Sequence, residues 1–266
     1  MMKCKFCLII CLLLIAFPAR TQNDSSGYFT SFDGTRIYYE QKGKGETIVL
    51  IHGFIVSGDS WKKTTLYQEL IAAGYHVLLF DMRGNGKSDK PHTATAYQQD
   101  AEAKDIMGIL DYLNVKKYIA IGYSRGSIIT ARLLVLDSRV LKAVIGGMGD
   151  GFTDPDWPRR ILFYKALSGE TVKELEGMVK YVKESGLDQQ ALALLQKEQP
   201  ATVPSELKNI KQPLLVICGD KDLDNGSPLA LKNLVPLAQL EIVPGDHGST
   251  LRSVPFSKAV MEFIRK

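Results

Sequence analysis

Short runs of β-branched and other apolar residues alternate along the chain with longer segments in which apolar residues recur every three or four positions. The short runs predict buried strands, and the periodic segments predict helices packed against them. Strands are expected at residues 47–51, 76–80, 118–121, 141–145, 214–218 and 240–243, and helices at 60–73, 97–113, 125–136, 227–235 and 253–264. Such alternation predicts the α/β class, with a mostly parallel, doubly wound sheet and helices on both faces.

Two further short strands precede this alternation. Residues 29–31 and 36–40 flank the turn residues Asp33 and Gly34, which predicts an antiparallel hairpin at one edge of the sheet. The sheet is therefore expected to have about eight strands.

One interval is too long for an ordinary crossover between parallel strands. Residues 150–212 separate two predicted strands, and they contain helical patterns at 161–167, 172–182 and 187–196. We expect a helical cap over one edge of the sheet, inserted into a single domain that spans residues 22–266.

The first residues have the pattern of a signal peptide. Lys3 and Lys5 precede an apolar stretch at 8–17, Pro18 ends that stretch, and Ala19 offers a small residue near a cleavage point. We expect residues 1–21 to be removed and the protein to be secreted or periplasmic, without a membrane span after cleavage. An uncleaved anchor is the alternative.

Loss of the leader changes the charge and cysteine count. The formal net charge falls from +4 to +1, and no cluster of cations remains that would indicate a nucleic-acid surface. Only Cys218 survives, so no intramolecular disulfide is expected, and its apolar surroundings predict a buried strand residue. The four histidines are dispersed, and no pattern implies a metal or a cofactor.

The sequence Gly122-Tyr123-Ser124-Arg125-Gly126 lies between a predicted strand and a predicted helix. A Gly-x-Ser-x-Gly turn in this context holds a serine in a strained bend with its hydroxyl exposed, which predicts a nucleophile at Ser124. The alternative is a polar turn in which Ser124 only caps the helix.

A serine nucleophile needs a base and an acid that follow it in the chain. His247 is the only histidine after Ser124, and it lies in a loop between the last predicted strand and the last helix. The sequence leaves the carboxylate open among four aspartates that follow strands, namely Asp150, Asp220, Asp222 and Asp224.

Acyl transfer also needs donors for a developing oxyanion. The backbone N–H of Arg125 is one candidate, and that of Phe54, after Gly53, is the other. His52 precedes the serine and is expected to brace this loop. Residues 81–88 lack the spacing of a phosphate-binding loop and are expected to form a glycine-rich turn.

Taken together, His52-Gly53-Phe54, the 81–88 segment, the serine turn, Gly219-x-x-Asp222 and Gly245-x-His247 resemble the α/β-hydrolase superfamily in their usual order. The resemblance spans essentially the whole chain after the leader. It implies that Asp222, three residues after the glycine that ends its strand, is the triad acid, with Asp220 second. It also implies a mobile helical cap. An epoxide hydrolase or dehalogenase of this fold uses an aspartate where this chain has serine.

The resemblance leaves the substrate open, because such proteins include esterases, lipases, peptidases, carbon–carbon hydrolases and cofactor-free perhydrolases. We expect a serine hydrolase that cleaves a small carboxylic ester. The alternatives are an aminopeptidase-like or carbon–carbon-bond hydrolase, or a binding protein without activity. Trp61, Trp157 and Phe163 are candidate pocket residues, although ordinary core packing explains such aromatics equally well. The sequence gives no indication of the oligomeric state.

Overall fold

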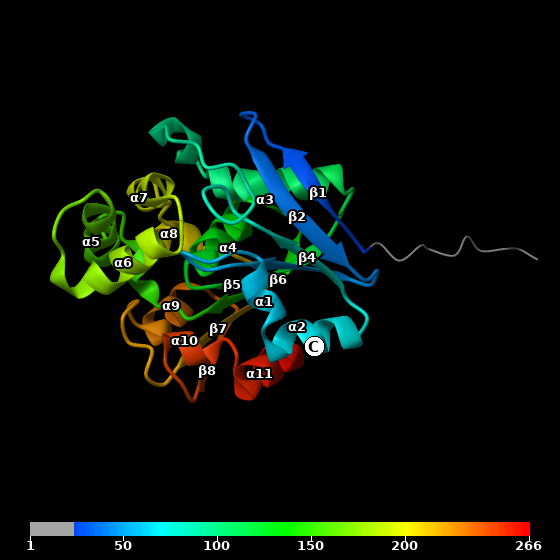
Figure 1. Ribbon diagram of the computed structural model, residues 1–266. Coiled ribbons are helices and arrows are strands. Elements are labelled where there is room, and N and C mark those ends of the chain that lie inside the picture. Colours follow the sequence, from blue (N-terminus) through cyan, green and yellow to red (C-terminus); the bar gives the residue numbers. More distant parts are fainter. Residues whose placement is uncertain (1–23) are drawn as a thin grey trace, which may run out of the picture.

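Eight strands form one sheet in the order β1-β2-β4-β3-β5-β6-β7-β8 (Figure 1). The computed structural model describes residues 24–266, so the predicted leader at 1–21 lies outside the described residues. The strands are β1 (Ser25–Thr30), β2 (Arg36–Lys42), β3 (Thr47–Ile51), β4 (His76–Phe80), β5 (Tyr118–Tyr123), β6 (Val140–Gly146), β7 (Leu214–Gly219) and β8 (Ala238–Val243). Strand β2 is antiparallel to β1 and β4. The other neighbouring strands, in the sheet order β4-β3-β5-β6-β7-β8, are parallel. The predicted fold class is confirmed.

Helices follow the strands in the order expected of crossovers. The helices outside the 150–212 interval are α1 (Asp59–Lys62), α2 (Thr65–Ala72), the 3-10 turn η1 (Ala94–Tyr97), α3 (Ala101–Tyr112), α4 (Arg125–Leu136), α9 (Pro228–Leu234), α10 (His247–Thr250) and α11 (Val254–Arg265). Those within it are η2 (Asp150–Thr153), α5 (Pro158–Leu167), η3 (Lys173–Leu175), α6 (Glu176–Glu184), α7 (Gln189–Lys197) and α8 (Pro204–Leu207).

Two predicted helices are shorter than the hydrophobic pattern indicated. The helix expected at 60–73 is interrupted at Thr64, whose backbone is extended and whose hydroxyl accepts the Tyr67 N–H at the start of α2. The helix expected at 97–113 begins only at Ala101, because Gln99 and Asp100 have φ values of 54° and 60° in the left-handed region. Helical periodicity does not register such breaks when apolar residues continue across them.

The two faces of the sheet bury separate apolar clusters. One cluster lies between the sheet and α3, α4 and α9, and includes Ile106, Ile129 and Leu231. The other lies between the sheet and α2 and α11, and includes Leu70 and Phe256. Because both faces are covered, the central strands are buried along their whole length, as their continuous apolar runs predicted.

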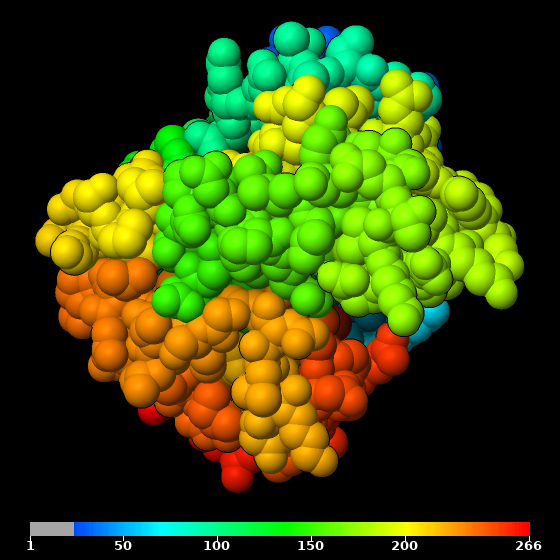
Figure 2. All heavy atoms as spheres, turned by 90° about the vertical axis from the view of Figure 1, so that its left-hand side faces the viewer, coloured from blue at the N-terminus to red at the C-terminus, as the bar shows by residue number. Residues whose placement is uncertain are grey.

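Residues 150–212, the helical insertion, connect β6 to β7 and lie at one end of the sheet (Figure 1). Seen from that end, they cover much of the molecule (Figure 2). Their own apolar cluster includes Leu167, Val182 and Leu195, and Phe54 and Ile55 from the loop after β3 pack against it. The helical insertion therefore contacts the loop that the sequence assigned to oxyanion binding.

Candidate active site

Ser124 lies at the turn between β5 and α4. Its backbone has φ 55° and ψ −124°, a conformation that non-glycine residues rarely adopt, and its N–H donates to the Gly146 carbonyl at 2.8 Å. A Cβ atom on Gly122 would lie 2.3 Å from the carbonyl oxygen of Gly126, and one on Gly126 would lie 2.1 Å from that of Ile51. The two glycines thus permit the close approach of strand and helix that creates this bend.

Replacing Gly126 with alanine is expected to lower the free energy of unfolding by about 3 kcal/mol, because the neighbouring atoms belong to the backbone and cannot rotate away. The matched control is Gly177→Ala in α6, where an added Cβ meets nothing within 4 Å and φ is not positive. That change is expected to raise stability by about 0.5 kcal/mol. Urea denaturation of both variants checks the prediction, and equal effects would contradict it.

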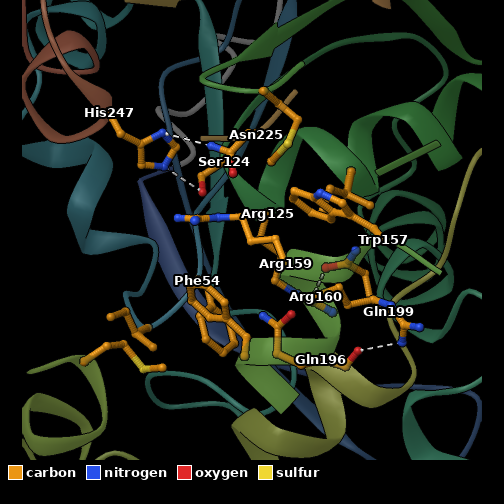
Figure 3. A pocket seen from close by; sticks show the side chains of 15 residues that line it. Phe54, Ser124, Arg125, Trp157, Arg159, Arg160, Gln196, Gln199, Asn225 and His247 are labelled. Atoms are coloured by element: carbon orange, nitrogen blue, oxygen red, sulfur yellow. Dashed lines mark hydrogen bonds between the residues drawn. The ribbon is translucent and has the colours of Figure 1, made fainter. Parts of the chain in front are cut away.

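His247 begins α10, in the loop after β8, and its imidazole contacts both other predicted triad members. Figure 3 shows its contact with Ser124. Nε2 lies 2.9 Å from the Ser124 hydroxyl, and Nδ1 lies 2.8 Å from Oδ2 of Asp222. The Asp222 side chain is 1% exposed and that of His247 is 40% exposed. The structure therefore brings together three residues of which the first and last, Ser124 and His247, are 123 positions apart in the chain.

These contacts define the proton positions. In the neutral imidazole one ring nitrogen carries a proton. Because Nε2 accepts a hydrogen bond from the Ser124 hydroxyl, that proton is on Nδ1, which donates a hydrogen bond to Asp222. Asn225 also lies close, with its side-chain nitrogen 3.4 Å from Nδ1, and that nitrogen donates to the Gly147 carbonyl at 3.2 Å. In this tautomer, Nδ1 has no lone pair for Asn225, so Asp222 is the partner that orients the ring.

The other candidate aspartates bind elsewhere. Asp220 accepts the Gly245 N–H at 2.9 Å, and Asp150 accepts the Ser227 N–H at 2.7 Å. Asp224 lies 3.5 Å from the guanidinium of Arg159. Of the four, only Asp222 contacts His247.

Tyr123 fixes the loop that carries the histidine. Its hydroxyl donates to the carbonyl of His247 at 2.7 Å, and its ring centroid lies 5.3 Å from that of the imidazole. The residue before Ser124 in the turn is therefore bonded to the backbone of the residue that contacts the Ser124 hydroxyl. Tyrosine at this position was noted in the sequence, but this contact was not predicted.

The two predicted oxyanion donors are free to bind a ligand. Within residues 24–266, no hydrogen bond engages the backbone N–H of Phe54 or that of Arg125 at the start of α4. A Cβ on Gly53 would lie 3.4 Å from the Ser124 Cβ, so this glycine leaves space beside the hydroxyl.

His52 holds the loop after β3 in place through two hydrogen bonds. Its Nε2 accepts the Met82 N–H at 2.9 Å, and its Nδ1 donates to the Gly53 carbonyl at 2.7 Å. Burial lowers the pKa of His52, which keeps the ring neutral and able to accept at Nε2. The bracing role expected for His52 agrees with these contacts.

The Arg125 side chain forms a buried ion pair that the sequence did not indicate. Its Nε and Nη2 bond both carboxylate oxygens of Glu102 in α3, at 3.1 and 2.5 Å, and Nη1 contacts the Gln199 side chain at 3.3 Å. The Arg125 side chain thus connects α3 with the helical insertion.

A cavity of about 250 Å³ opens beside Ser124 and His247 (Figure 3). Its remaining lining consists of Phe54, Ile55, Arg125, Ile128, Met148, Trp157, Arg159, Arg160, Phe163, Met178, Gln196, Gln199 and Asn225. Trp157 and Phe163 lie in the wall, as the sequence suggested. Trp61 does not, because it is fully buried in the apolar cluster between the sheet and α2 and α11. Most lining residues of the helical insertion were not predicted, because their positions depend on how its helices pack.

The thiol of Cys218 does not line this cavity, although it donates to the carbonyl of Met148, which does. Burial raises the pKa of the Cys218 thiol to about 12, which leaves it protonated and unreactive at neutral pH. Within residues 24–266, no group of three or more histidine, cysteine or acidic side chains has the arrangement of a metal site. No helix in that range is long and apolar enough to cross a membrane.

Comparison with known proteins places the chain in a family. Residues 46–172 match the family model described as alpha/beta hydrolase fold. A putative non-heme chloroperoxidase of Synechocystis is 40% identical over 41% of this chain, and the chain spans only 39% of that protein. A non-heme haloperoxidase of Rhodococcus erythropolis is 26% identical over 89% of this chain and 98% of its own length.

Solved structures agree with this assignment. An esterase from Rhodococcus sp. ECU1013 has a TM-score of 0.69 and 26% identity, covering 91% of this chain and 99% of its own. Epoxide hydrolases are also among the relatives. The fold is that of the α/β hydrolases, and the family-model match together with these likenesses supports the α/β-hydrolase superfamily for this chain. Its relatives are enzymes of that fold, which supports a hydrolase activity.

Proposed function

We propose that this protein is a secreted serine hydrolase that cleaves small carboxylic esters through an acyl-enzyme formed on Ser124. The observation that carries the proposal is the continuous hydrogen-bonded chain from the Ser124 hydroxyl through His247 to Asp222, with distances of 2.9 and 2.8 Å. The secretion part rests on the pattern of residues 1–21. N-terminal sequencing of exported protein tests that part, and an intact leader would contradict it.

The proposed reaction has two halves. His247 takes the proton of Ser124 as the serine oxygen attacks the ester carbonyl, and Asp222 stabilises the resulting imidazolium. The oxyanion accepts the N–H groups of Phe54 and Arg125, and the alcohol leaves with the proton from His247. Water, activated by the same imidazole, then attacks the acyl-enzyme and releases the acid.

The size and lining of the cavity support a small ester. A space of about 250 Å³ with walls from Phe54, Ile128 and Phe163 accommodates a short or medium acyl group. The similarity to a Rhodococcus esterase supports the same class. Serine at position 124 argues against epoxide opening in the manner of relatives with a carboxylate nucleophile.

The lining argues against an aminopeptidase. A peptidase that recognises a free N-terminus needs an acidic partner for the ammonium group, and none of the residues that line the cavity is acidic. The helical insertion does carry the acidic residues Asp154, Asp156 and Glu170, but they are exposed and lie outside the lining. Carbon–carbon hydrolysis stays an alternative, since one relative is a hydrolase of 2-hydroxy-6-oxononadienedioate.

Perhydrolysis is a second candidate, and the similarity to named haloperoxidases supports it. In this reaction hydrogen peroxide attacks the acyl-enzyme in place of water and forms a peroxy acid. The peroxy acid then transfers one oxygen to a halide ion, giving the carboxylate and hypohalous acid. The same Ser124, His247 and Asp222 serve both reactions, so only the competing nucleophile differs.

A panel of 4-nitrophenyl esters from acetate to decanoate, with and without hydrogen peroxide and bromide, tests both candidates. We expect saturable release of 4-nitrophenol from the shorter esters, because the cavity is small. Bromination of monochlorodimedone that requires both peroxide and a carboxylate would add perhydrolysis. Absence of turnover with every ester, in protein shown by circular dichroism to be folded, would refute the esterase proposal.

A further inference from the structure

We propose that the preferred substrate carries an anionic group on the part that occupies the cavity, and that Arg159 binds this group. The proposal rests on the esterase function proposed above and names its substrate class. It starts from the charges of the cavity wall. The lining includes three arginines, Arg125, Arg159 and Arg160, and no aspartate or glutamate.

The first arginine is already neutralised by the protein. Arg125 is buried and bonded to both carboxylate oxygens of Glu102, at 3.1 and 2.5 Å. A bidentate pair of this kind leaves no net charge for a ligand. Arg125 therefore serves the architecture of the site and does not select for substrate charge.

Arg160 lacks a carboxylate partner among the described residues. Arg160 donates to the carbonyls of Gln196 and Lys197 through Nη1 and to that of Pro155 through Nη2. Its Nε–H is buried and has no partner among the described residues. Neutral carbonyls do not cancel a guanidinium charge, so Arg160 adds positive potential to the wall.

Arg159 is the arginine of the wall that is best able to bind a ligand. Arg159 sits in the first turn of α5, and its side chain is 37% exposed. Its only carboxylate contact in the described part of the chain is Asp224 at 3.5 Å, and that aspartate is 71% exposed. Its guanidinium lies 5.1 Å from the ring centroid of Phe163, another wall residue. An exposed pair at this distance contributes little, so exchange of Asp224 for a substrate carboxylate costs little.

The remaining lining fits an acyl chain that ends in a charge. Apolar side chains, including Phe54, Ile128 and Met148, share the lining with Ser124. The helical insertion contributes Arg159 and Arg160 to the same wall (Figure 3). An ester whose acyl group has an apolar stem and a distal carboxylate matches both features. With a neutral acyl chain of the same length, Arg160 would still have only neutral acceptors, and Arg159 only the exposed Asp224.

The test compares two esters that differ mainly in charge, mono-4-nitrophenyl adipate and 4-nitrophenyl heptanoate. The wild-type protein is expected to have the higher kcat/KM for the adipate ester. Arg159→Gln is expected to lower kcat/KM for adipate by about tenfold, the typical value of a charge-assisted hydrogen bond, while the heptanoate value changes less than about twofold. Arg159→Lys should recover part of the adipate activity, because it restores the charge.

The matched control is Lys165→Gln, which removes a cation from the same helix outside the cavity lining. It should leave both esters unchanged. Efficient turnover of heptanoate with no preference for adipate, or an equal loss for both esters in Arg159→Gln, would refute the charge preference and leave the esterase function intact. Failure of the wild-type protein to hydrolyse either ester would refute the esterase function, and this proposal with it.

Discussion

Ser124→Ala is expected to lower kcat for 4-nitrophenyl esters by a factor of about 10⁴ or more, since loss of a serine nucleophile removes the covalent route entirely. The variant should fold normally, because no hydrogen bond of the hydroxyl other than that to His247 is present among residues 24–266. Steady-state kinetics together with thermal unfolding checks both statements.

Ser168→Ala is the control for this change, since Ser168 is an exposed serine at the end of α5. It should keep full activity. A Ser124→Ala protein that retains more than about 1% of the wild-type kcat would show that another group attacks the ester, and the mechanism would be wrong.

Asp222→Asn is expected to lower kcat by about 10⁴, the effect seen when a triad carboxylate becomes an amide and the imidazole adopts the wrong tautomer. The buried carboxylate accepts the Nδ1 proton of His247 at 2.8 Å, and an amide of the same shape does not stabilise the imidazolium. KM should change much less than kcat, because Asp222 does not line the cavity.

Asp220→Asn is a matched control two residues away. Among the described residues, the Asp220 side chain accepts a hydrogen bond only from the Gly245 N–H, and an asparagine oxygen can accept that bond equally well. Its turnover should stay within about threefold of wild type. If Asp220→Asn were the variant that lost several orders of magnitude, the assignment of the acid would be reversed.

Much of the fold was predictable because its strands are buried on both faces. Runs such as 47–51 and 76–80 consist almost wholly of apolar residues, and they became β3 and β4 with the same bounds. The helix interruption at Thr64 was not predictable from periodicity, because the apolar pattern continues on both sides while the threonine caps a new helix.

The site was predictable where a short local motif dictates geometry. The glycines around Ser124 signal a tight turn, and only one histidine follows it. The choice among the aspartates needed coordinates, because three of them lie within five residues and differ only in where their side chains point. Trp61 could not be placed from the sequence, because an aromatic side chain fits a pocket wall and an apolar core equally well. In the structure it is fully buried in the core.

The cavity wall was the least predictable part. Arg159 in α5, Gln196 in α7 and Gln199 just after α7 line the same cavity as Ser124, and the packing of α5 against α7 places them there. Their sequence separation from Ser124 exceeds thirty residues, and no local pattern distinguishes them from other polar residues on helix surfaces. Substrate selection is therefore the property for which the structure adds most to the sequence.

The proposed mechanism depends on Ser124 as the nucleophile, activated by His247. Its most direct test is reaction of the protein with an alkyl fluorophosphonate, followed by peptide mapping by mass spectrometry. We expect one phosphonyl adduct, located on Ser124, whose formation is at least about a hundredfold slower in His247→Ala. An adduct on a different residue, or no adduct on folded protein, would contradict it.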